Sequence, residues 1–262
     1  MVENLFDLTG KIALVTGGNS GLGLAFANGL ARAGADVIIW GRREDRNREA
    51  EASLRAHGGR VASQAVDVSN EDAVIAGMKQ AVETFGRLDC VVANAGTATV
   101  APIQDMSGDI WHKLLGVNLH GVFYTCREAA KHMIARAEAG DRGGSIILNG
   151  SLAVFAGVPG LSHYAAAKGG LNSFSKTLAT ELGAHGIRVN TICPGLIVTE
   201  IIEADPVMSK VVIPATIRRT PLQALGRPED LEGIVVYLAS DRSRYHTGDT
   251  ITLDGGMMAQ NF

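Results

Sequence analysis

A hydroxyl, a phenol and an amine lie close together in the sequence, at Ser151, Tyr164 and Lys168. Because Tyr164 and Lys168 are four residues apart, both side chains project from one face if the segment is helical. A free tyrosine has a pKa of about 10 and is a poor base near neutral pH. An ammonium about 4 Å away stabilises the phenolate by roughly 4 kcal/mol at an effective dielectric constant of about 20. We therefore expect Lys168 to lower the pKa of Tyr164, and Tyr164 to exchange a proton with an oxygen that Ser151 hydrogen-bonds.

The elements around these residues are expected to bring them together. The run from Ile146 to Leu148 is short and apolar, which is typical of a buried strand. Ser151 follows that strand, and the alanine-rich segment after Tyr164 favours a helix. Ligands of open α/β sheets bind at the carboxyl ends of the strands, so the sequence predicts a ligand site here.

A second ligand signal lies near the start of the chain. The apolar run from Lys11 to Thr16 predicts a parallel strand covered on both faces, and a helical pattern follows from Leu22 to about Ala33. The glycine-rich turn between them would bind phosphate through free N–H groups and the positive end of the helix dipole. The residues expected to contact a dinucleotide here are Gly17, Asn19, Ser20, Gly21, Leu22 and Gly23.

The end of the next predicted strand, 36–40, indicates which dinucleotide binds. An acidic residue that contacts the adenosine ribose usually stands at this point, but here Gly41, Arg42 and Arg43 follow Trp40. Because arginine pairs well with phosphate, we expect Arg42 to bind a ribose 2′-phosphate and the protein to prefer NADP(H). The alternatives are that both arginines are simply solvated, and that the cofactor is NAD(H).

A third strand is expected at 61–66. Asp67 and Val68 come at its carboxyl end and could border an adenine ring. Alternatively, Asp67 or Ser69 could cap the helix that follows.

The rest of the chain continues the alternation of strands and helices. Further strands are expected at 88–93, 186–192 and 251–253. A helical stretch over 107–136 contains Asn118 between two glycines, and these weak helix formers predict a kink where Asn118 could hold a water or a backbone carbonyl. The element order predicts an α/β fold, a doubly wound seven-stranded parallel sheet with helices on both faces.

We expect one domain over 1–262 with a lid over the substrate at about 199–227. The lid region shows no strong periodicity, and apolar residues cluster from Ile201 to Ile213. A long connection at this edge of a sheet is more often a binding lid than an idle loop.

Composition excludes several classes of function. With 46% hydrophobic and 19% charged residues the chain is an ordinary globular one, and a net charge of −3 gives no electrostatic case for nucleic acid or an anionic membrane. No apolar run approaches the ~18 residues of a membrane span, and no residues have metal-ligand spacing. Cys90, Cys126 and Cys193 are few, odd in number and in apolar contexts, and no signal peptide is evident, so we expect reduced thiols in a cytoplasmic protein.

Taken together, these motifs resemble those of the short-chain dehydrogenase/reductase family in its single-domain form, over nearly the whole chain. The family's usual sheet order, 3-2-1-4-5-6-7, fits the element order above. Its members are commonly homotetramers. The motifs that match in order and spacing are Thr16-Gly17-x-x-x-Gly21-x-Gly23, Asp67, Asn94-Ala95-Gly96, Asn118, Ser151, Tyr164-x-x-x-Lys168, Pro194-Gly195 and Thr199.

The resemblance implies a role for each matching residue. Tyr164 would be the general acid/base, Ser151 would polarise the substrate oxygen, and Lys168 would also bind the nicotinamide ribose. Asn118 would hold a water that links Lys168 to a proton relay. Residues 94–96 would line the adenosine side, and the nicotinamide would be bordered by Pro194, Gly195, Ile197 and Thr199.

The implied reaction is hydride transfer between NADP(H) and a secondary alcohol or ketone. Two substrate indications disagree: the opening segment 5–11 is similar to that of sugar-acid and polyol dehydrogenases, whereas the apolar lid with Phe155 and Val158 favours an apolar ketone or 3-oxoacyl chain. Asn149 and Gly150 are smaller than the usual pair before the serine and would widen the site. The alternative from another functional class is a non-catalytic protein that senses the NADP(H) pool.

Overall fold

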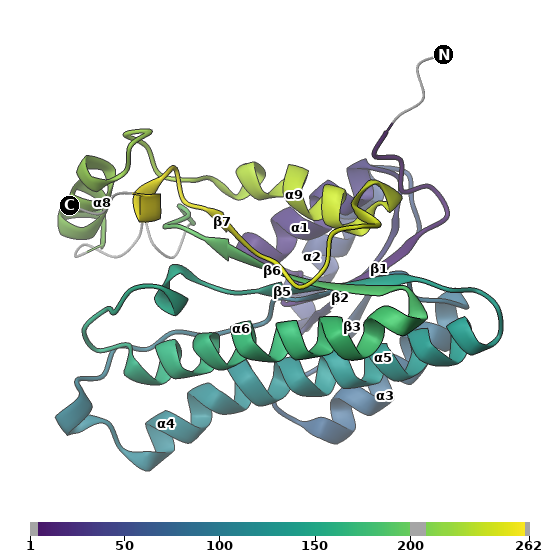
Figure 1. The fold of residues 1–262 in the computed structure, drawn as a ribbon, viewed down its shortest axis with the longest axis horizontal. Helices are drawn as coiled ribbons and strands as arrows, with labels where there is room; N and C mark the ends of the chain where they lie inside the picture. Colours follow the sequence, from purple (N-terminus) through teal and green to yellow (C-terminus); the bar gives the residue numbers. More distant parts are fainter. Residues whose placement is uncertain (1–4, 200–207, 260–262) are drawn as a thin grey trace.

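The computed structural model, shown in Figure 1, describes residues 5–199 and 208–259. Within these residues seven strands form one sheet in the order β3-β2-β1-β4-β5-β6-β7, and every neighbouring pair is parallel. The predicted doubly wound sheet and its strand order are confirmed. The strands are β1 (Ile12–Thr16), β2 (Asp36–Gly41), β3 (Val61–Ala65), β4 (Cys90–Ala93), β5 (Gly144–Asn149), β6 (Ile187–Pro194) and β7 (Thr250–Leu253).

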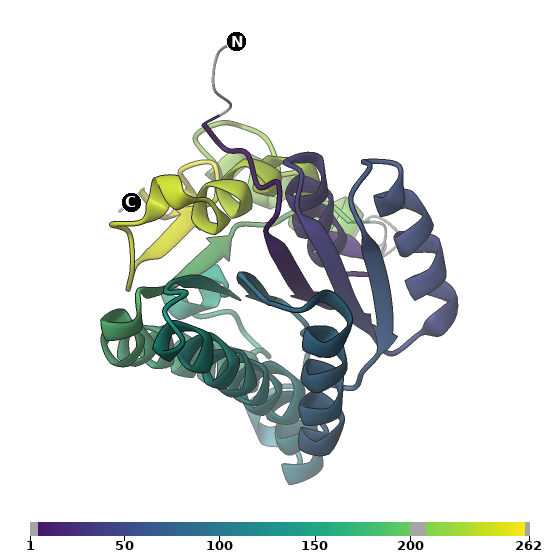
Figure 2. The ribbon, with the colours of Figure 1, turned by 90° about the vertical axis from the view of Figure 1, so that its right-hand side faces the viewer.

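Helices pack on both faces of the sheet, as Figures 1 and 2 show. α1, α2 and α9 cover one face, where they form an apolar cluster with Val37 and Ile39 of β2. α3, α5 and α6 cover the opposite face, around Ile38 of β2 and Ile146 of β5. The helices are α1 (Gly21–Arg32), α2 (Glu44–Arg55), α3 (Glu71–Phe85), α4 (Gly108–Leu115), α5 (Gly121–Glu138), α6 (Ser162–Leu182), α8 (Ile213–Arg219) and α9 (Glu232–Ala239).

The apolar runs of the sequence form the central strands because helices cover both faces of the sheet. Every residue of β1 and of β6 is buried, which is the unbroken pattern expected of parallel strands. The two edge strands, β3 and β7, are more polar and only partly buried. The sheet therefore holds its middle strands rigidly and presents their ends at fixed positions.

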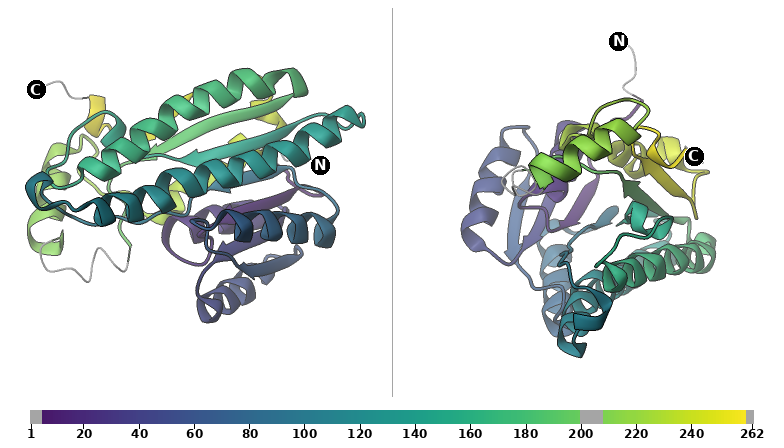
Figure 3. Two further views of the ribbon diagram at one scale, coloured as in Figure 1. Left: turned by 90° about the horizontal axis from the view of Figure 1, so that it is seen from below. Right: turned by 90° about the vertical axis from the view of Figure 1, so that its left-hand side faces the viewer.

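The carboxyl ends of the parallel strands meet at one edge of the sheet. β1 pairs with β2 on one side and with β4 on the other, so the strand order reverses between β1 and β4, where open α/β sheets form a crevice. α5 and α6 run side by side beneath this sheet, as the left panel of Figure 3 shows. The segments that leave the crevice edge are the glycine-rich turn and the loops after β4, β5 and β6.

The kink expected near Asn118 is confirmed. A π turn over Gly116–His120 separates α4 from α5, and the N–H of Gly121 donates to the carbonyl of Gly116. Such wide turns are frequent at functional sites.

The alternative that Asp67 or Ser69 caps the following helix needs correction. Neither Asp67 nor Ser69 caps α3; its N-cap is Asn70, whose side chain accepts from the N–H of Ala73 over 3.1 Å. The carboxylate of Asp67 instead turns back onto Ser69, accepting from its N–H and its hydroxyl.

The connection after β6 contains more regular structure than its sequence pattern indicates. A π turn at Met208–Val212 leads into α8. The apolar residues Ile201, Ile202 and Val207 of the expected lid lie outside the described residues.

Two further observations concern the described residues. None of their helices is long and apolar enough to cross a membrane. Cys90, Cys126 and Cys193 are buried and form no disulfide.

Candidate functional site

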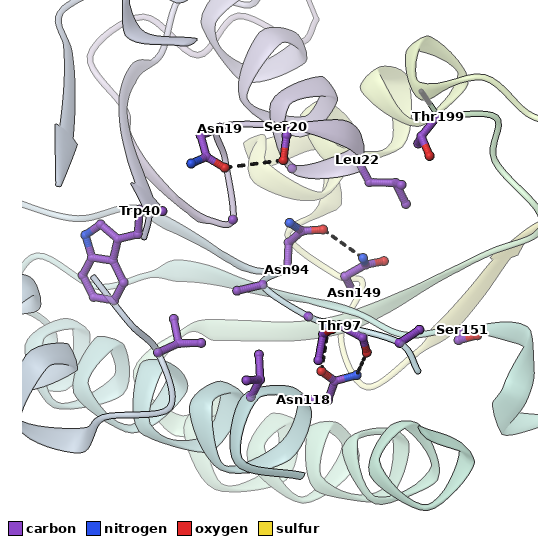
Figure 4. A pocket seen from close by; sticks show the side chains of 18 of the residues that line it. Asn19, Ser20, Leu22, Trp40, Asn94, Thr97, Asn118, Asn149, Ser151 and Thr199 are labelled. Carbon is purple, nitrogen blue, oxygen red and sulfur yellow. Dashed lines mark hydrogen bonds between the residues drawn. The ribbon is translucent and has the colours of Figure 1, made fainter. Parts of the chain in front are cut away.

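A cavity of about 930 Å³ opens at the carboxyl edge of the sheet. It brings together residues from the glycine-rich turn and from the ends of β2, β3, β4, β5 and β6 (Figure 4). Of the residues expected to act in catalysis or to bind the cofactor, Gly21 is the one that is not in its wall. The predicted residues that line it are Gly17, Asn19, Ser20, Leu22, Gly23, Arg42, Asp67, Val68, Asn94, Ala95, Gly96, Asn118, Ser151, Tyr164, Lys168, Pro194, Gly195, Ile197 and Thr199.

Ser151, Tyr164 and Lys168 lie at one end of this cavity. β5 ends two residues before Ser151, and α6 presents Tyr164 and Lys168 one turn apart. Nζ of Lys168 lies 5.7 Å from the centre of the Tyr164 ring and donates to the backbone carbonyl of Asn149 over 2.6 Å. The Ser151 hydroxyl is near enough to the phenol to lower its pKa, and it accepts from the N–H of Ala153 over 3.1 Å. The hydroxyl, the phenol and the amine therefore line the same part of the cavity.

The pKa values of this cluster differ from the expectation. Burial raises the pKa of the Tyr164 phenol, and the hydrogen bond with Ser151 opposes that rise only in part. Burial also lowers the pKa of the Lys168 amine, to about 8. Lys168 is 3% exposed, and for the phenol the effect of burial outweighs the influences that lower its pKa. The predicted lowering of the Tyr164 pKa is wrong for this arrangement, because the sequence does not reveal how deeply both groups are buried.

Asn118 is fully buried in the π turn and clamps the loop after β4. Its Oδ1 accepts from the N–H of Thr97, and its Nδ2 donates to the carbonyl of Thr97, both over 2.8 Å (Figure 4). We expected Asn118 to hold either a water or a backbone carbonyl, and its side chain holds the backbone of Thr97. A relay water at this position would therefore have to bind the backbone carbonyl of Asn118.

The glycine-rich turn is too tight to admit side chains. Gly17 has φ +65°, and a Cβ on Gly23 would overlap the carbonyl of Gly17. Asn94 packs against the same turn, donating from Nδ2 to the carbonyl of Thr16 over 2.9 Å. In the described part of the chain the side chain of Ser20 makes no capping hydrogen bond at the start of α1. The first turn of α1 thus offers N–H groups to an anion, and the turn fits the pyrophosphate of a dinucleotide.

The far end of the cavity carries positive charge. Arg42 is 71% exposed in its side chain and lies 3.9 Å from the carboxylate of Asp67. A Cβ on Gly41 would overlap the amides of Asn19 and Asn47, which are joined by a 2.7 Å hydrogen bond. A carboxylate side chain at position 41 would therefore have to displace these two amides. Burial raises the pKa of Asp67, but hydrogen bonds from Ser69 and the charge of Arg42 hold it below the usual value.

Sequence reasoning missed several lining residues. Thr97 is held by Asn118, Lys113 of α4 brings a further cation, and Asn149 was noted only for its size. A signal for Asn149 was present, because it is a polar residue at the end of an apolar strand directly before Gly150 and Ser151. Among the described residues no group of three or more His, Cys, Asp or Glu side chains is placed to hold a metal ion.

Comparisons with known proteins agree with this geometry. A family model described as enoyl-(acyl carrier protein) reductase matches residues 17–258. L-rhamnose 1-dehydrogenase (NAD(P)(+)) of Sphingomonas sp. (strain SKA58) is 38% identical over 251 residues, which are 95% of this chain and 97% of that protein. The 3-oxoacyl-[acyl-carrier-protein] reductase FabG of Chlamydia pneumoniae is 36% identical over 250 residues, 95% of this chain and 98% of that protein.

Solved structures show the same likeness. A short-chain type dehydrogenase/reductase from Mycobacterium marinum superposes with a TM-score of 0.91 at 35% identity, covering 99% of this chain and 100% of that one. A gluconate 5-dehydrogenase from Burkholderia cenocepacia J2315, in complex with NADP and tartrate, gives a TM-score of 0.90 at 32% identity and covers 98% of both chains. With the seven-stranded sheet, the glycine-rich turn and the Tyr164–Lys168 pair in place, the chain belongs to the short-chain dehydrogenase/reductase family, whose members are NAD(P)-dependent enzymes acting on CH–OH groups.

Proposed function

We propose that the protein transfers a hydride between NADP(H) and a secondary alcohol or ketone, with Tyr164 as general acid/base. The observation that carries the proposal is the cluster of Ser151, Tyr164 and buried Lys168 in the same cavity as the glycine-rich turn. The bound cofactor supplies or accepts the hydride. Tyr164 gives a proton to the substrate oxygen in reduction and removes it in oxidation, while Ser151 hydrogen-bonds that oxygen. Lys168 binds the nicotinamide ribose, and Asn118 fixes the loop after β4 and holds the relay water through its backbone carbonyl.

The remaining cavity residues would hold the cofactor along its length. The glycine-rich turn takes the pyrophosphate, Asp67 and Val68 border the adenine, and residues 94–96 line the adenosine side. Pro194, with Gly195, Ile197 and Thr199, borders the nicotinamide. All of these residues except Gly21 line the one cavity, which supports a continuous binding path.

Preference for NADP(H) rests on the end of β2. Gly41 is crowded by Asn19 and Asn47, so the usual ribose-binding carboxylate is absent, and Arg42 stands exposed beside the cavity. The pairing of Arg42 with Asp67 is long and solvent-exposed, and such pairs contribute little, so a 2′-phosphate can displace it. The relatives' names include both NAD(P) and NADP, and NAD(H) use is the alternative.

Two substrate classes follow from the relatives and the cavity surroundings. The relatives include a sugar dehydrogenase and a 3-oxoacyl reductase. Phe155 and Val158, beside Ser151, are about half exposed and apolar, which supports an apolar ketone or acyl chain. Of the lid expected at about 199–227, the described part 208–227, which contains α8, would cover the substrate. Rates on a panel of polyols, sugar acids and 3-oxoacyl thioesters decide between the classes.

The deciding experiment is a fluorescence titration of the purified protein with NADPH and, separately, NADH. Tighter binding of NADPH supports the reading of Arg42 and directs the substrate screen to ketones. Tighter binding of NADH contradicts the NADP(H) preference and directs the screen to alcohols. Binding of neither nucleotide rejects the proposed function.

We further propose a cytoplasmic homotetramer. Phe123 of α5 is 41% exposed and contacts Phe174 of α6, and a Cβ on Gly170 would meet Leu119 at an ordinary contact distance. Apolar and small residues on these two helices suit burial between subunits. Sedimentation velocity measures the mass directly, and a monomer would contradict the proposal.

A further inference from the structure

Asn149 breaks the apolar pattern of β5 at its last position. The residues from Ser145 to Leu148 are buried, and Asn149 follows with its side chain beside the cavity (Figure 4). Its Nδ2 donates to Oδ1 of Asn94 over 2.9 Å. Its own Oδ1 is buried and has no hydrogen-bond partner among the described residues.

The neighbouring residues fix the orientation of this amide. Nδ2 of Asn94 donates to the carbonyl of Thr16, so Oδ1 of Asn94 is an acceptor that must face a donor. Within the described part of the chain, Nδ2 of Asn149 supplies that donor, which leaves Oδ1 of Asn149 unpaired. A buried acceptor without a partner is costly, and an apolar side chain at this position would avoid that cost. The donor function of the amide is therefore what distinguishes Asn149 from an apolar residue.

Four buried side-chain atoms lack a hydrogen-bond partner among the described residues, and they belong to His132, Asn149, His163 and Thr191. Of these four residues, Asn149 is the one that lines the cavity. The unpaired Oδ1 of Asn149 is thus a buried polar atom of the cavity wall.

Direct hydrogen bonds connect Asn149 to both ends of the cavity. On its side-chain side, Asn94 connects it to the carbonyl of Thr16, which directly precedes the glycine-rich turn. The hydroxyl of Thr16 also accepts from the N–H groups of Asn94 and Ala95. On its backbone side, the carbonyl of Asn149 accepts from Nζ of Lys168. One residue therefore touches both the support of the turn and the amine beside Tyr164.

We propose that Asn149 is a positioning residue that couples the glycine-rich turn to Lys168 through Asn94. The proposal rests on the function proposed above, in which the turn and Lys168 hold opposite parts of the cofactor. Hydrogen bonds in a buried network reinforce one another, so losing the Asn149 donor releases the turn and the end of β5 together. The consequence is weaker cofactor binding, although Asn149 lies in neither the glycine-rich turn nor α6, which carries Lys168.

Two substitutions separate a donor role from a packing role. Asn149→Leu keeps the approximate size and removes the donor. Asn149→Asp keeps the shape and sets a carboxylate oxygen against Oδ1 of Asn94. If Asn149 acts through packing, the NADPH affinity of the Asp variant should be nearest to that of wild type. If Asn149 acts as a donor, the Asp variant should have the lowest NADPH affinity.

The test is an NADPH titration followed by fluorescence at pH 8, with folding checked by circular dichroism. Asn190→Leu is the matched control, because the Asn190 amide bonds the carbonyl of His246 and the N–H of Asp249 outside the cavity. We expect Kd to rise about tenfold in Asn149→Leu, as for the loss of one hydrogen bond, further in Asn149→Asp, and not in the control. Asn149→Ser replaces the Leu variant if that variant does not fold.

A double-mutant cycle with Asn94→Ala measures the coupling itself. If Asn149 acts through Asn94, the two losses of NADPH affinity do not multiply, because the second substitution removes a contact that is already broken. Losses that multiply independently would overturn the inference, as would an Asp variant that binds like wild type. If wild-type protein binds NADPH and the variants match it, this inference alone fails; if wild-type protein binds no nucleotide, the proposed function fails as well.

Discussion

Nζ of Lys168 donates a 2.6 Å hydrogen bond to the backbone carbonyl of Asn149, which fastens α6 to the carboxyl end of β5. The amine is nearly inaccessible to solvent, and burial lowers its pKa to about 8. Burial of the amine beside Tyr164 therefore costs desolvation free energy whenever the amine is charged.

This cost makes stability depend on pH. Between about pH 8 and the ordinary Lys pKa of 10.5, the unfolded state binds more protons than the folded state, so the Lys168 contribution to stability rises with pH. Below that window the amine is charged in both states, and burying it costs about 3 kcal/mol. We expect the free energy of unfolding of wild type, relative to that of Lys168→Met, to increase as pH rises from 7 to 10. Urea denaturation of both proteins measures this difference.

The buried thiols act in the opposite direction in the same comparison. Burial raises the pKa of Cys90 and of Cys126 to about 12, so their contribution to stability falls as pH rises above the ordinary value of 9.0. Both proteins keep Cys90 and Cys126, so the contribution of these two thiols cancels in the difference between the proteins. Parallel pH curves for the two proteins would show that the amine is not destabilised by burial.

Replacing Tyr164 by Phe removes the proton-exchanging group and little else. We expect turnover to fall by about 10² to 10⁴, the usual contribution of general acid–base catalysis, with NADPH binding nearly unchanged. Tyr245→Phe is the matched control, because Tyr245 is fully exposed. A Tyr164→Phe variant with normal turnover would favour the non-catalytic sensor.

The raised pKa of Tyr164 predicts different pH profiles for the two directions of the reaction. Reduction needs the protonated phenol, which burial favours across the neutral range. Oxidation needs the phenolate, so its initial rate should increase with pH toward the alkaline range. Initial rates from pH 6 to 10 in both directions check this, and an oxidation rate that does not respond to pH would contradict the assignment.

Arg42→Asp should reverse the preference between the two nucleotides. A hydrogen bond to a charged group contributes about 1.5–3 kcal/mol, so NADPH affinity should fall by roughly 10- to 100-fold while NADH affinity is retained. Arg46→Asp is the control, because Arg46 lies four residues further along in α2, pairs with Glu49 and does not line the cavity. Equal losses of NADPH affinity in both variants would indicate a general charge effect.

Gly23→Ala tests the tightness of the phosphate-binding turn. Its Cβ would overlap the carbonyl of Gly17, so the turn must open, and we expect loss of both nucleotide affinity and stability. Gly233→Ala, at an exposed position of α9 with nothing within 4 Å of the added Cβ, should instead gain about 0.5–1 kcal/mol of stability. Thermal unfolding with and without NADPH measures both effects, and a Gly23→Ala variant that binds normally would contradict the turn assignment.

The order and type of the elements followed from the sequence alone, because their signals are local. Apolar runs indicated buried parallel strands, and glycines marked the turn before α1 and the kink at Asn118. The spacing of Tyr164 and Lys168 placed both on one helical face. The loop after β6 was less readable, because α8 lacks a strong periodic pattern and takes its form from the surrounding structure.

Only the tertiary structure decided which groups are buried and which partners they find. The burial of Lys168 and Tyr164, which reverses the expected pKa direction of the phenol, depends on helices and strands far apart in the sequence. The pairing of Asn118 with Thr97, and of Asn149 with Asn94, likewise joins residues separated by tens of positions. Hydrogen-bond partners and desolvation are set by three-dimensional neighbours, so no local pattern in the sequence could specify them.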